Sequence, residues 1–276
     1  MKRRMIFLVL FIFILTSCST ETEEPSSSTP DIFIAVHLES GANPKTTLYP
    51  EKYWPALVEL VEVADKSNIK LTLEFNPQWG TYILEDSEKV DLLRSWEAAG
   101  HEIAVHHHGP HHGSWNGYTN QEEYKDDSEY IGSIEEMMDI LNQLPSDGNL
   151  YTGAISKEED KDLDWPEGII YSTEGGANGE EDLLSLPTVF SYNGIEGLNL
   201  QHATYAIGKT DVSLSQIADA LENAKEEEVL GIVFHVHDFE EKPKIIQTLF
   251  ELFESKNAEV KTVKDIFSSF EQENSL

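Results

Sequence analysis

The sequence contains one cysteine and few basic residues. Among its 276 residues, 19 are Lys or Arg and 51 are Asp or Glu, which gives a formal net charge of −32. A single cysteine excludes an internal disulfide. The strong negative charge opposes binding to the phosphate backbone of nucleic acids, so we expect no nucleic-acid partner. A chain of this length buries a large core in one domain without disulfides.

Two common catalytic motifs are also missing. No G-x-S-x-G sequence is present, which excludes a serine nucleophile on the usual strand-to-helix elbow. Gly175, Gly176 and Gly179 are not followed by Lys-Ser or Lys-Thr, which excludes a phosphate-binding loop there. Any catalytic group must therefore come from other residue types.

The N-terminus has the pattern of a targeting segment. Lys2, Arg3 and Arg4 form a basic region, and an apolar run over residues 6–15 follows them. This run is too short to span a bilayer, which needs about 20 residues, so it is typical of a secretory signal. Residues 15–18, Leu-Thr-Ser-Cys, resemble the lipobox of bacterial lipoproteins, in which the cysteine is acylated and becomes the new N-terminus.

We therefore expect residues 1–17 to be a lipoprotein signal peptide and Cys18 to be the lipidation site. The alternative is an ordinary secretory peptide or N-terminal anchor with an incidental cysteine. Residues 18–30 are rich in Ser, Thr, Glu and Pro and predict a flexible tether before a folded domain over 31–276. The expected location is the cell envelope, on the periplasmic or extracellular face, with the lipid bilayer as a partner through acylated Cys18.

From residue 31 onward, short β-rich runs alternate with helix-like stretches. The pattern predicts strands over 31–38, 69–75, 101–106, 168–172 and 229–236. It predicts helices over 51–66, 86–99, 119–143, 213–227 and 242–256. Residues 156–166 and 173–187 are acidic or rich in glycine, which is typical of loops, and one or two further strands are expected within 188–207. This alternation favours an α/β domain with a largely parallel sheet or barrel.

Six of the ten histidines fall within residues 101–112. The sequence alternates as a strand up to His106, and Gly109, Pro110 and Gly113 then predict a turn. The histidines expected at the carboxyl end of this strand are His106, His107, His108, His111 and His112. This edge of an α/β sheet or barrel collects ligands and catalytic groups. Imidazole suits Zn²⁺, Ni²⁺, Co²⁺ and Fe²⁺, so the cluster predicts a divalent metal site, with a solvated histidine-rich loop as the alternative.

Two other predicted strands end with comparable groups. His37 and Glu39 share one face of the first strand, because side chains alternate along a strand with a period of two. On the predicted strand over 229–236 and just after it, His235 and His237 are expected to share the face opposite to Phe234 and Val236. If the sheet closes, the three strand ends converge on one metal ion.

Residues 98–106, AAGHEIAVH, resemble the strand that ends in a metal-binding histidine in the polysaccharide deacetylase family, the NodB-like carbohydrate esterases of family four. Residues 233–239, VFHVHDF, and the helix and strand-plus-helix pattern after them resemble the family's last histidine strand and closing elements. The likeness covers roughly residues 31–270 in the order of elements, and only the two histidine segments are specific. The resemblance implies a distorted, incomplete (β/α) barrel of about seven strands.

The chain departs from the family pattern at the first motif. Where the family carries two adjacent aspartates, a catalytic base and a metal ligand, this chain has Glu39 and Ser40. Ser40 is a poor metal ligand, so His37 or Glu39 would take over that role. The family's arginine-proline motif also has no counterpart, and residues 151–154 occupy its place.

The spacing of the metal-binding histidines differs as well. The family's pair lies four residues apart, but Pro110 stands four residues after His106. The resemblance therefore favours His106 with His111, one residue further than usual. His107 with His111 is the alternative, because that pair keeps the usual spacing.

The resemblance implies a metal-dependent hydrolase that removes N-acetyl or O-acetyl groups from a cell-surface or extracellular polysaccharide. The candidate ligands for a divalent metal, Zn first and Co, Ni or Fe as alternatives, are His37, His106, His107 and His111. Glu39 would be the general base, His235 the acid that protonates the departing amine, and His237 a group that orients the amine or joins the metal. The missing aspartate and arginine motif favour an alternative, a metal- or glycan-binding lipoprotein without activity on a degenerate deacetylase scaffold.

Three aromatic residues are candidates for stacking on the sugar rings of a glycan: Trp79, Trp115 and Tyr118. Trp115 lies beside the histidine loop between two glycines, which leave it little covering. Trp79 follows a proline, and core packing is equally expected for it. These residues would line the mouth of the site.

Overall fold

The computed structural model describes residues 29–146, 149–155, 161–173, 183–205, 212–225 and 227–274. The predicted signal peptide and the predicted lipidation residue, Cys18, lie outside the described residues. Among the helices that are described, none is long and apolar enough to cross a membrane. The first strand begins at Asp31, where the sequence predicted the start of the folded domain.

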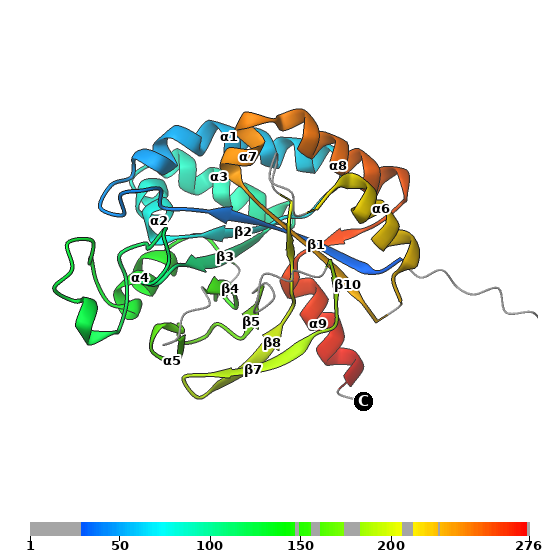
Figure 1. Cartoon of the computed structure of the whole chain (residues 1–276). Helices are drawn as coiled ribbons and strands as arrows, with labels where there is room; N and C mark the ends of the chain where they lie inside the picture. The colour runs from blue at the N-terminus through cyan, green and yellow to red at the C-terminus, as the bar shows by residue number, and fades with distance from the viewer. Residues whose placement is uncertain are drawn as a thin grey trace, which may run out of the picture.

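A curled sheet occupies the centre of the described chain (Figure 1). Its strands are β1 (Asp31–Leu38), β2 (Thr72–Phe75), β3 (Glu102–His107), β4 (Thr152–Ile155), β5 (Tyr171–Ser172), β6 (Leu184–Ser185), β7 (Thr188–Tyr192), β8 (Ile195–Asn199), β9 (Ala203–Thr204), β10 (Val229–His235) and β11 (Val260–Lys261). The hydrogen-bonded order is β6-β10-β1-β2-β3-β4-β5-β8-β7, with β11 beside β1 and β9 beside β10. The seven neighbouring strands from β10 to β8 run parallel, and β6 and β7 pair antiparallel at the edges. The expected incomplete (β/α) barrel of about seven strands is confirmed.

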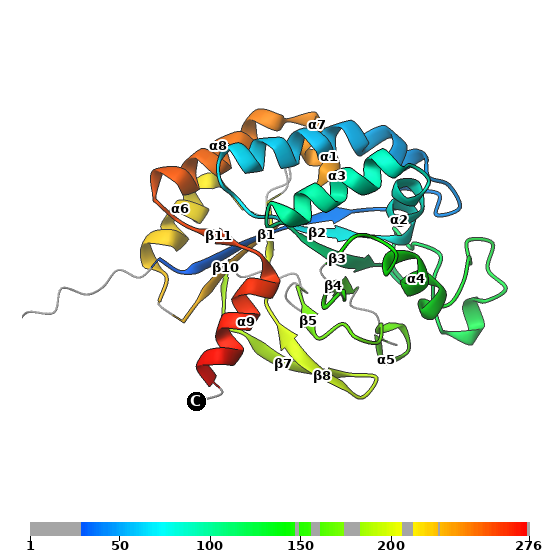
Figure 2. The same ribbon diagram turned by 180° about the vertical axis from the view of Figure 1, so that it is seen from behind.

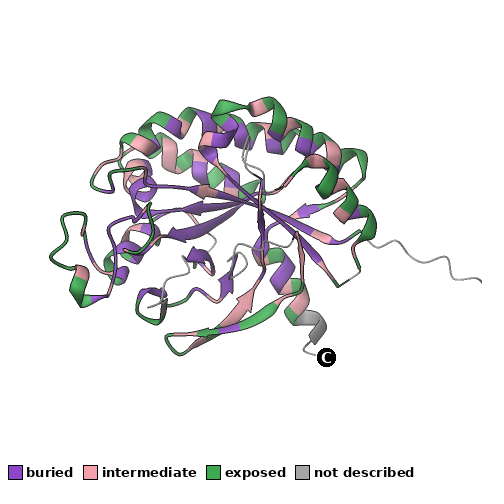
Figure 3. Ribbon diagram, in the orientation of Figure 1, coloured by how far each residue is buried: buried purple, intermediate pink, exposed green. Residues whose placement is uncertain are grey.

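Helices cover the convex face of the sheet (Figures 1 and 2). The helices are α1 (Leu48–Lys66), α2 (Pro77–Leu84), α3 (Ser87–Ala98), α4 (Ile134–Leu141), α5 (Lys161–Asp164), α6 (Leu214–Asn223), α7 (Val236–Glu241), α8 (Pro243–Ser255) and α9 (Val263–Asn274). Helix α9 packs on the other, concave side, where the rings of Tyr171 and Phe267 stack with centroids 4.7 Å apart. Figure 3 shows buried residues along the central strands β1, β2 and β3, mostly exposed or intermediate residues along β7 and β8, and exposed residues on the outward faces of the helices.

Side-chain alternation along β1 separates the apolar core from the polar face. Four alternate residues are fully buried in the main core under the helices: Ile32, Ile34, Val36 and Leu38. Phe33 and Ala35 belong to a second cluster on the concave side, which includes residues of α9. Because successive side chains point to opposite faces, His37 and Glu39 continue the row of Phe33 and Ala35. The concave face of β1 therefore changes from apolar to polar toward the carboxyl end.

The predicted helix over 119–143 is wrong over most of its length. Helix α4 begins only after Ser133, whose side chain accepts a hydrogen bond from the first turn in a capping box. The preceding segment is a loop with one short 3-10 turn. Thr119 Oγ1 and the backbone nitrogen of Asn120 both donate to the buried Asp164 carboxylate. These tertiary contacts hold the segment in a loop and override its helical pattern.

Several strand predictions also change. The predicted strand over 229–236 ends at His235, because α7 begins at the next residue. The predicted strand over 168–172 shortens to β5, and β4 was not predicted. Strand β6 lies within the loop predicted over 173–187, and 188–207 holds β7, β8 and β9, more than the one or two strands expected. Short strands in the middle of a sheet are fixed by neighbouring strands and leave little pattern in the local sequence.

Gly231 in β10 allows neighbouring groups to pack against its backbone. A Cβ atom at this position would collide with the carbonyl oxygen of Gln201 and lie 2.6 Å from the Phe33 ring. We expect Gly231→Ala to lower the free energy of unfolding by about 1–3 kcal/mol, because the overpacked backbone must move. Urea unfolding followed by tryptophan fluorescence measures the change.

Gly113→Ala is the matched control for this prediction. A Cβ atom at Gly113 meets nothing within 4 Å, so the substitution should change stability by less than about 0.5 kcal/mol. Equal stability of the two variants would contradict the packing constraint at Gly231.

Candidate metal centre

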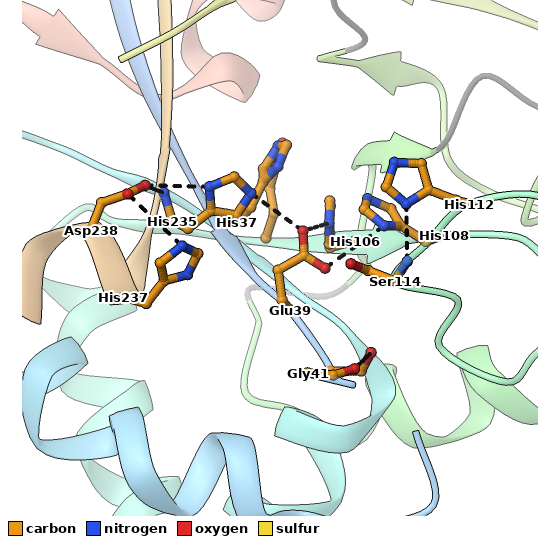
Figure 4. A network of polar contacts seen from close by, with 12 residues as sticks. His37, Glu39, Gly41, His106, His108, His112, Ser114, His235, His237 and Asp238 are labelled. Carbon is orange, nitrogen blue, oxygen red and sulfur yellow. Dashed lines mark hydrogen bonds and ion pairs between the residues drawn. The ribbon is translucent and has the colours of Figure 1, made fainter. Parts of the chain in front are cut away.

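The carboxyl ends of three parallel strands meet at one edge of the sheet (Figure 4). His37 lies near the end of β1 and Glu39 directly follows that strand, while His106 lies on β3 and His235 ends β10. His37 and His235 are register partners on neighbouring strands, so their side chains share the concave face. The three strand ends therefore bring together the groups that the sequence predicted would converge.

The Glu39 carboxylate is the centre of this group. Its Oε1 lies 3.4 Å from His106 Nε2 and 3.3 Å from His235 Nε2, and its Oε2 lies 3.7 Å from His108 Nδ1. Burial by itself would raise the pKa of Glu39, but His106 and His235 hold this pKa well below its usual value. Glu39 is therefore ionised at neutral pH and has imidazole nitrogens on several sides.

His37 lies deeper in the sheet than Glu39. Its ring centroid is 4.2 Å from that of His106, 5.4 Å from that of His235 and 5.5 Å from that of His202. Burial lowers the pKa of His37 well below its usual value, and repulsion from the neighbouring imidazoles lowers it further. His37 is therefore neutral, which is the form of histidine that binds metal ions.

His235 differs from His37 because it has two acidic partners. The Asp238 Oδ2 atom accepts the backbone N–H of His235 at 2.9 Å and lies 3.3 Å from its Nδ1. Burial would lower the pKa of His235, but the contacts with Asp238 and Glu39 raise it to about 9. At neutral pH this ring is protonated and is a proton donor beside Glu39.

His237 does not share a strand face with His235, which corrects the sequence-based expectation. Helix α7 begins at Val236, and Asp238 in its first turn accepts the backbone N–H of His235. His237 therefore has helical rather than strand geometry. His237 Nδ1 contacts the hydroxyl of Tyr49 at 2.8 Å. Its ring centroid nevertheless remains 5.0 Å from that of His235, so His237 lies at the side of the centre.

The structure does not bring His107 or His111 together with His106. His107 points to the opposite face of β3, where its Nδ1 lies 3.1 Å from Asn116 Oδ1. His111 is exposed on the loop and contacts the Tyr124 hydroxyl at 3.1 Å. The role of both as metal ligands stays a prediction without geometric support, and His108 from the same loop approaches Glu39 instead.

The three aromatic candidates are buried, which agrees with the core-packing alternative for Trp79 and differs from the expectation that Trp115 has little covering. Trp79 is fully buried, and its Nε1 donates to the backbone carbonyl of Glu39 at 2.8 Å. Trp115 is 5 % exposed and donates to the carbonyl of Tyr118. Tyr118 also lines a cavity of about 780 Å³ between the loop after β1 and the loop before α4. Trp79 therefore holds the backbone of Glu39 in place. Of the three aromatic candidates, Tyr118 is the one that lines this cavity.

Sequence reasoning missed three residues around the centre, Glu74, His202 and Asp238, and it included His108 in the histidine cluster without choosing it as a ligand. Glu74 is an acid within an otherwise apolar run, LTLEF, and that contrast was the available signal. Its pKa is raised well above the usual value, because burial disfavours the carboxylate. His202 stands alone in a weakly patterned stretch, and only the pairing of β9 with β10 brings it near His37.

The donor set fits a divalent transition metal. His37, Glu39 and His106 each offer one ligand atom, and these atoms lie within 4.8 Å of one another. A tetrahedral ion with bonds of about 2.1 Å separates its ligand atoms by about 3.4 Å, close to the spacing between His106 and Glu39. His106 Nδ1 is buried and has no hydrogen-bond partner in the described part of the chain. A second set of residues, His235, His237 and Asp238, also has ligand atoms within 4.8 Å of one another. Asp238, however, already accepts a hydrogen bond from the backbone N–H of His235.

Comparison with known structures identifies the fold. No family model matches this sequence, and no curated protein sequence matches it. A chain described as a probable polysaccharide deacetylase from Pseudomonas aeruginosa PAO1 has a TM-score of 0.59 and 14 % identity, over 91 % of this chain and 94 % of that chain. This chain has the fold of the polysaccharide deacetylases. An allantoinase also has this fold, with a TM-score of 0.59 and 15 % identity over 88 % of this chain and 90 % of that chain.

The deacetylase fold also occurs with another activity. A 4-alpha-glucanotransferase from Thermococcus litoralis has a TM-score of 0.55 and 15 % identity, over 87 % of this chain but only 38 % of that chain. The resemblance of the two histidine segments to the deacetylase family agrees with the fold found. A shared fold does not determine a substrate, so the function must be argued from the residues of the site.

The contact between His235 and Asp238 predicts a pH dependence. In chelator-treated protein, we expect the His235 ring to titrate near a pKa of about 9. This value lies above that of an unfolded histidine, about 6.5. The protonated ring therefore adds stability that is complete below about pH 6.5 and is lost as the pH rises through the folded pKa. NMR titration of the histidine ring protons measures the pKa directly.

Asp238→Asn is the test variant for this prediction. It removes the negative charge beside His235, so the pKa of His235 should fall while the ring keeps a hydrogen-bond partner. A His235 ring that titrates at or below its unfolded value in the unaltered protein would contradict the assignment.

Proposed function

We propose that this protein is a metal-dependent hydrolase that removes N-acetyl or O-acetyl groups from a cell-surface or extracellular polysaccharide. The observation that carries the proposal is the convergence of His106, His108 and His235 nitrogens on the ionised Glu39 carboxylate. This group lies at the carboxyl edge of a sheet with the deacetylase fold, and active sites of (β/α) barrels lie at that edge. The fold and the site chemistry support the same reaction class.

The metal is part of the proposal. His37 and His106 would hold a divalent ion, with Glu39 as a third ligand in the alternative to its role as general base; Zn²⁺ is the first choice and Co²⁺, Ni²⁺ or Fe²⁺ are alternatives. When bound, such an ion supplies a Lewis acid for the acetyl carbonyl and lowers the pKa of water toward about 7. Ser40 is not a competing ligand, because it is buried and its hydroxyl donates to the carbonyl of Gly41.

The side chains divide the proton transfers between them. Hydrolysis of an acetamide breaks the C–N bond, gives the water oxygen to acetate and adds one proton to the departing amine. Glu39 is ionised and accepts the proton of the attacking water, while His235 carries a proton held by Asp238 and donates it to the amine nitrogen. An O-acetyl ester follows the same balance, with an alcohol as the leaving group.

We also propose that the protein is an envelope lipoprotein attached through acylated Cys18. Strand β1 begins at Asp31 on the amino edge of the sheet, and His37 lies at the opposite edge of the same strand. The chain that precedes Asp31 therefore enters the domain at the edge opposite the site, and a flexible tether at that edge leaves the site accessible to a polymer substrate.

Acetate release tests the reaction directly. Purified protein incubated with N-acetylated hexosamine oligomers should release acetate, and removal of the metal by a chelator should abolish the release, because the ion activates both carbonyl and water. Re-addition of Zn²⁺ or Co²⁺ should restore it. Protein that binds metal but releases no acetate from several acetylated glycans would favour the alternative, a metal- or glycan-binding lipoprotein without activity.

Glu39→Gln separates the two candidate roles of Glu39. If Glu39 is the general base, the variant should lose about 10²- to 10⁴-fold in kcat and keep its metal content. If Glu39 is a ligand, metal content per chain should fall together with activity. Metal analysis by mass spectrometry and acetate assays on the same samples give both readouts, and a variant with unchanged kcat would contradict either role.

A further inference from the structure

Glu74 is a buried carboxylate beside the proposed metal ligands that neither the reaction nor the ligand set uses. It lies on β2, is fully buried, and is the register partner of His37 on β1. Its Oε2 atom lies 2.9 Å from His37 Nε2. An acid in the interior is costly unless it has partners, so its place next to a single imidazole requires an explanation.

The contacts of Glu74 fix the direction of its carboxylate. Thr173 Oγ1 donates to the Oε1 atom of Glu74, which leaves Oε2 facing His37. The two atoms are close, but the direction of their contact does not meet hydrogen-bond geometry, and within the described residues neither Glu74 Oε2 nor His37 Nε2 forms a hydrogen bond with any group. These contacts form a short row across the sheet: Thr173, which follows β5, contacts Glu74 on β2, and Glu74 lies against His37 on β1.

We propose that Glu74 is the positioning residue of the metal centre, and that its carboxylate holds the Nε2 proton of His37 so that Nδ1 faces the ion. A metal-bound imidazole usually donates its other N–H to a carboxylate or carbonyl, which fixes the tautomer and the orientation of the ring. The inference rests on the proposed function only in that an ion binds His37.

This arrangement also explains how the chain departs from the family's first motif. With Ser40 in place of an acidic ligand, the carboxylate ligand of the family is absent at that position. His37 is the inward-facing residue of β1 just before Glu39, and Glu74 on the neighbouring strand lies within reach of its far nitrogen. An imidazole ligand with a buried acidic residue behind it thus takes the place of the family's directly bound carboxylate.

Glu74→Gln is the main test, because glutamine has almost the same shape but no charge. Metal affinity of the full protein is measured by competition with a chromophoric chelator for Zn²⁺ and for Co²⁺. We expect the dissociation constant to rise about 10- to 100-fold in this variant, which is the usual effect of losing such a partner. A change of less than about twofold, in a variant that folds, would overturn the proposal.

Glu102→Gln is the matched control. Glu102 is likewise buried on the next strand, β3, and accepts hydrogen bonds from Thr72, Thr152 and the backbone of Lys264, but it forms no hydrogen bond or ion pair with a histidine in the described part of the chain. This variant should lower the thermal midpoint and leave the metal dissociation constant within about twofold. Equal losses of affinity in both variants would show a general effect on the fold and would contradict a specific role for Glu74.

A second pair of variants keeps the test valid if Glu74→Gln does not fold. Thr173→Val removes the hydroxyl that holds Glu74 Oε1, so it should weaken metal binding in the same direction, and Thr173→Ser should restore it. In the Zn²⁺-loaded protein, long-range ¹H–¹⁵N spectra should show His37 protonated at Nε2. Protonation at Nδ1 would overturn the proposal.

The outcomes also separate this inference from the proposed function. If the unaltered protein binds metal and releases acetate while Glu74→Gln binds metal equally well, only the role of Glu74 is overturned. If the protein binds metal and depends on Glu74 but releases no acetate, the proposed hydrolysis is overturned and the positioning role stands. A protein that binds neither Zn²⁺ nor Co²⁺ would overturn both.

Discussion

The Glu39 carboxylate lies out of water among imidazole rings, and a buried charge is tolerated only with close partners. His106 and His235 provide these partners from strands on either side of β1. Trp79, fully buried, donates to the backbone carbonyl of Glu39 and so holds the main chain at this position. The geometry of the whole centre depends on this one residue, because each of the neighbouring imidazoles is oriented toward it.

The parallel sheet supplies the second constraint. His235, His37 and Glu74 form one lateral row across β10, β1 and β2, because each is the register partner of the next. Parallel strands place such rows at a common edge, where no further strand residues cover them. The row therefore combines a protonated imidazole, a neutral imidazole and a buried carboxyl group within one line of side chains.

The polar character continues below the site on the concave face. Glu102 accepts hydrogen bonds from Thr72 on β2 and Thr152 on β4, which joins three neighbouring strands. The first residues of α9 close this layer, since the backbone nitrogens of Val263 and Lys264 donate to Thr72 and Glu102. These bonds satisfy buried groups that would otherwise be costly, and they hold the sheet in the curved form that brings the strand ends together.

The sequence patterns gave correct predictions where the direction of a side chain depends only on the strand that carries it. The alternation in β1 and β3 placed His37, Glu39 and His106 correctly, because period-two geometry depends only on the local backbone. Prediction was wrong where a distant contact decides the conformation. Residues 119–133 have a helical pattern but form a loop, because Thr119 at their start donates to Asp164. His237 is not part of the strand, because α7 begins directly after His235 and Asp238 in its first turn accepts the backbone N–H of His235.

The sequence by itself determined the α/β class, the acidic character of the chain and the strand ends that carry histidine and carboxylate groups. Only the tertiary structure decided which of those groups meet. The register of β10, β1 and β2 places His235 and Glu74 beside His37. The path of the histidine loop brings His108, and not His111, close to Glu39. The reason is physical, because local patterns fix which face a side chain takes, whereas its partners depend on strands far away in the chain.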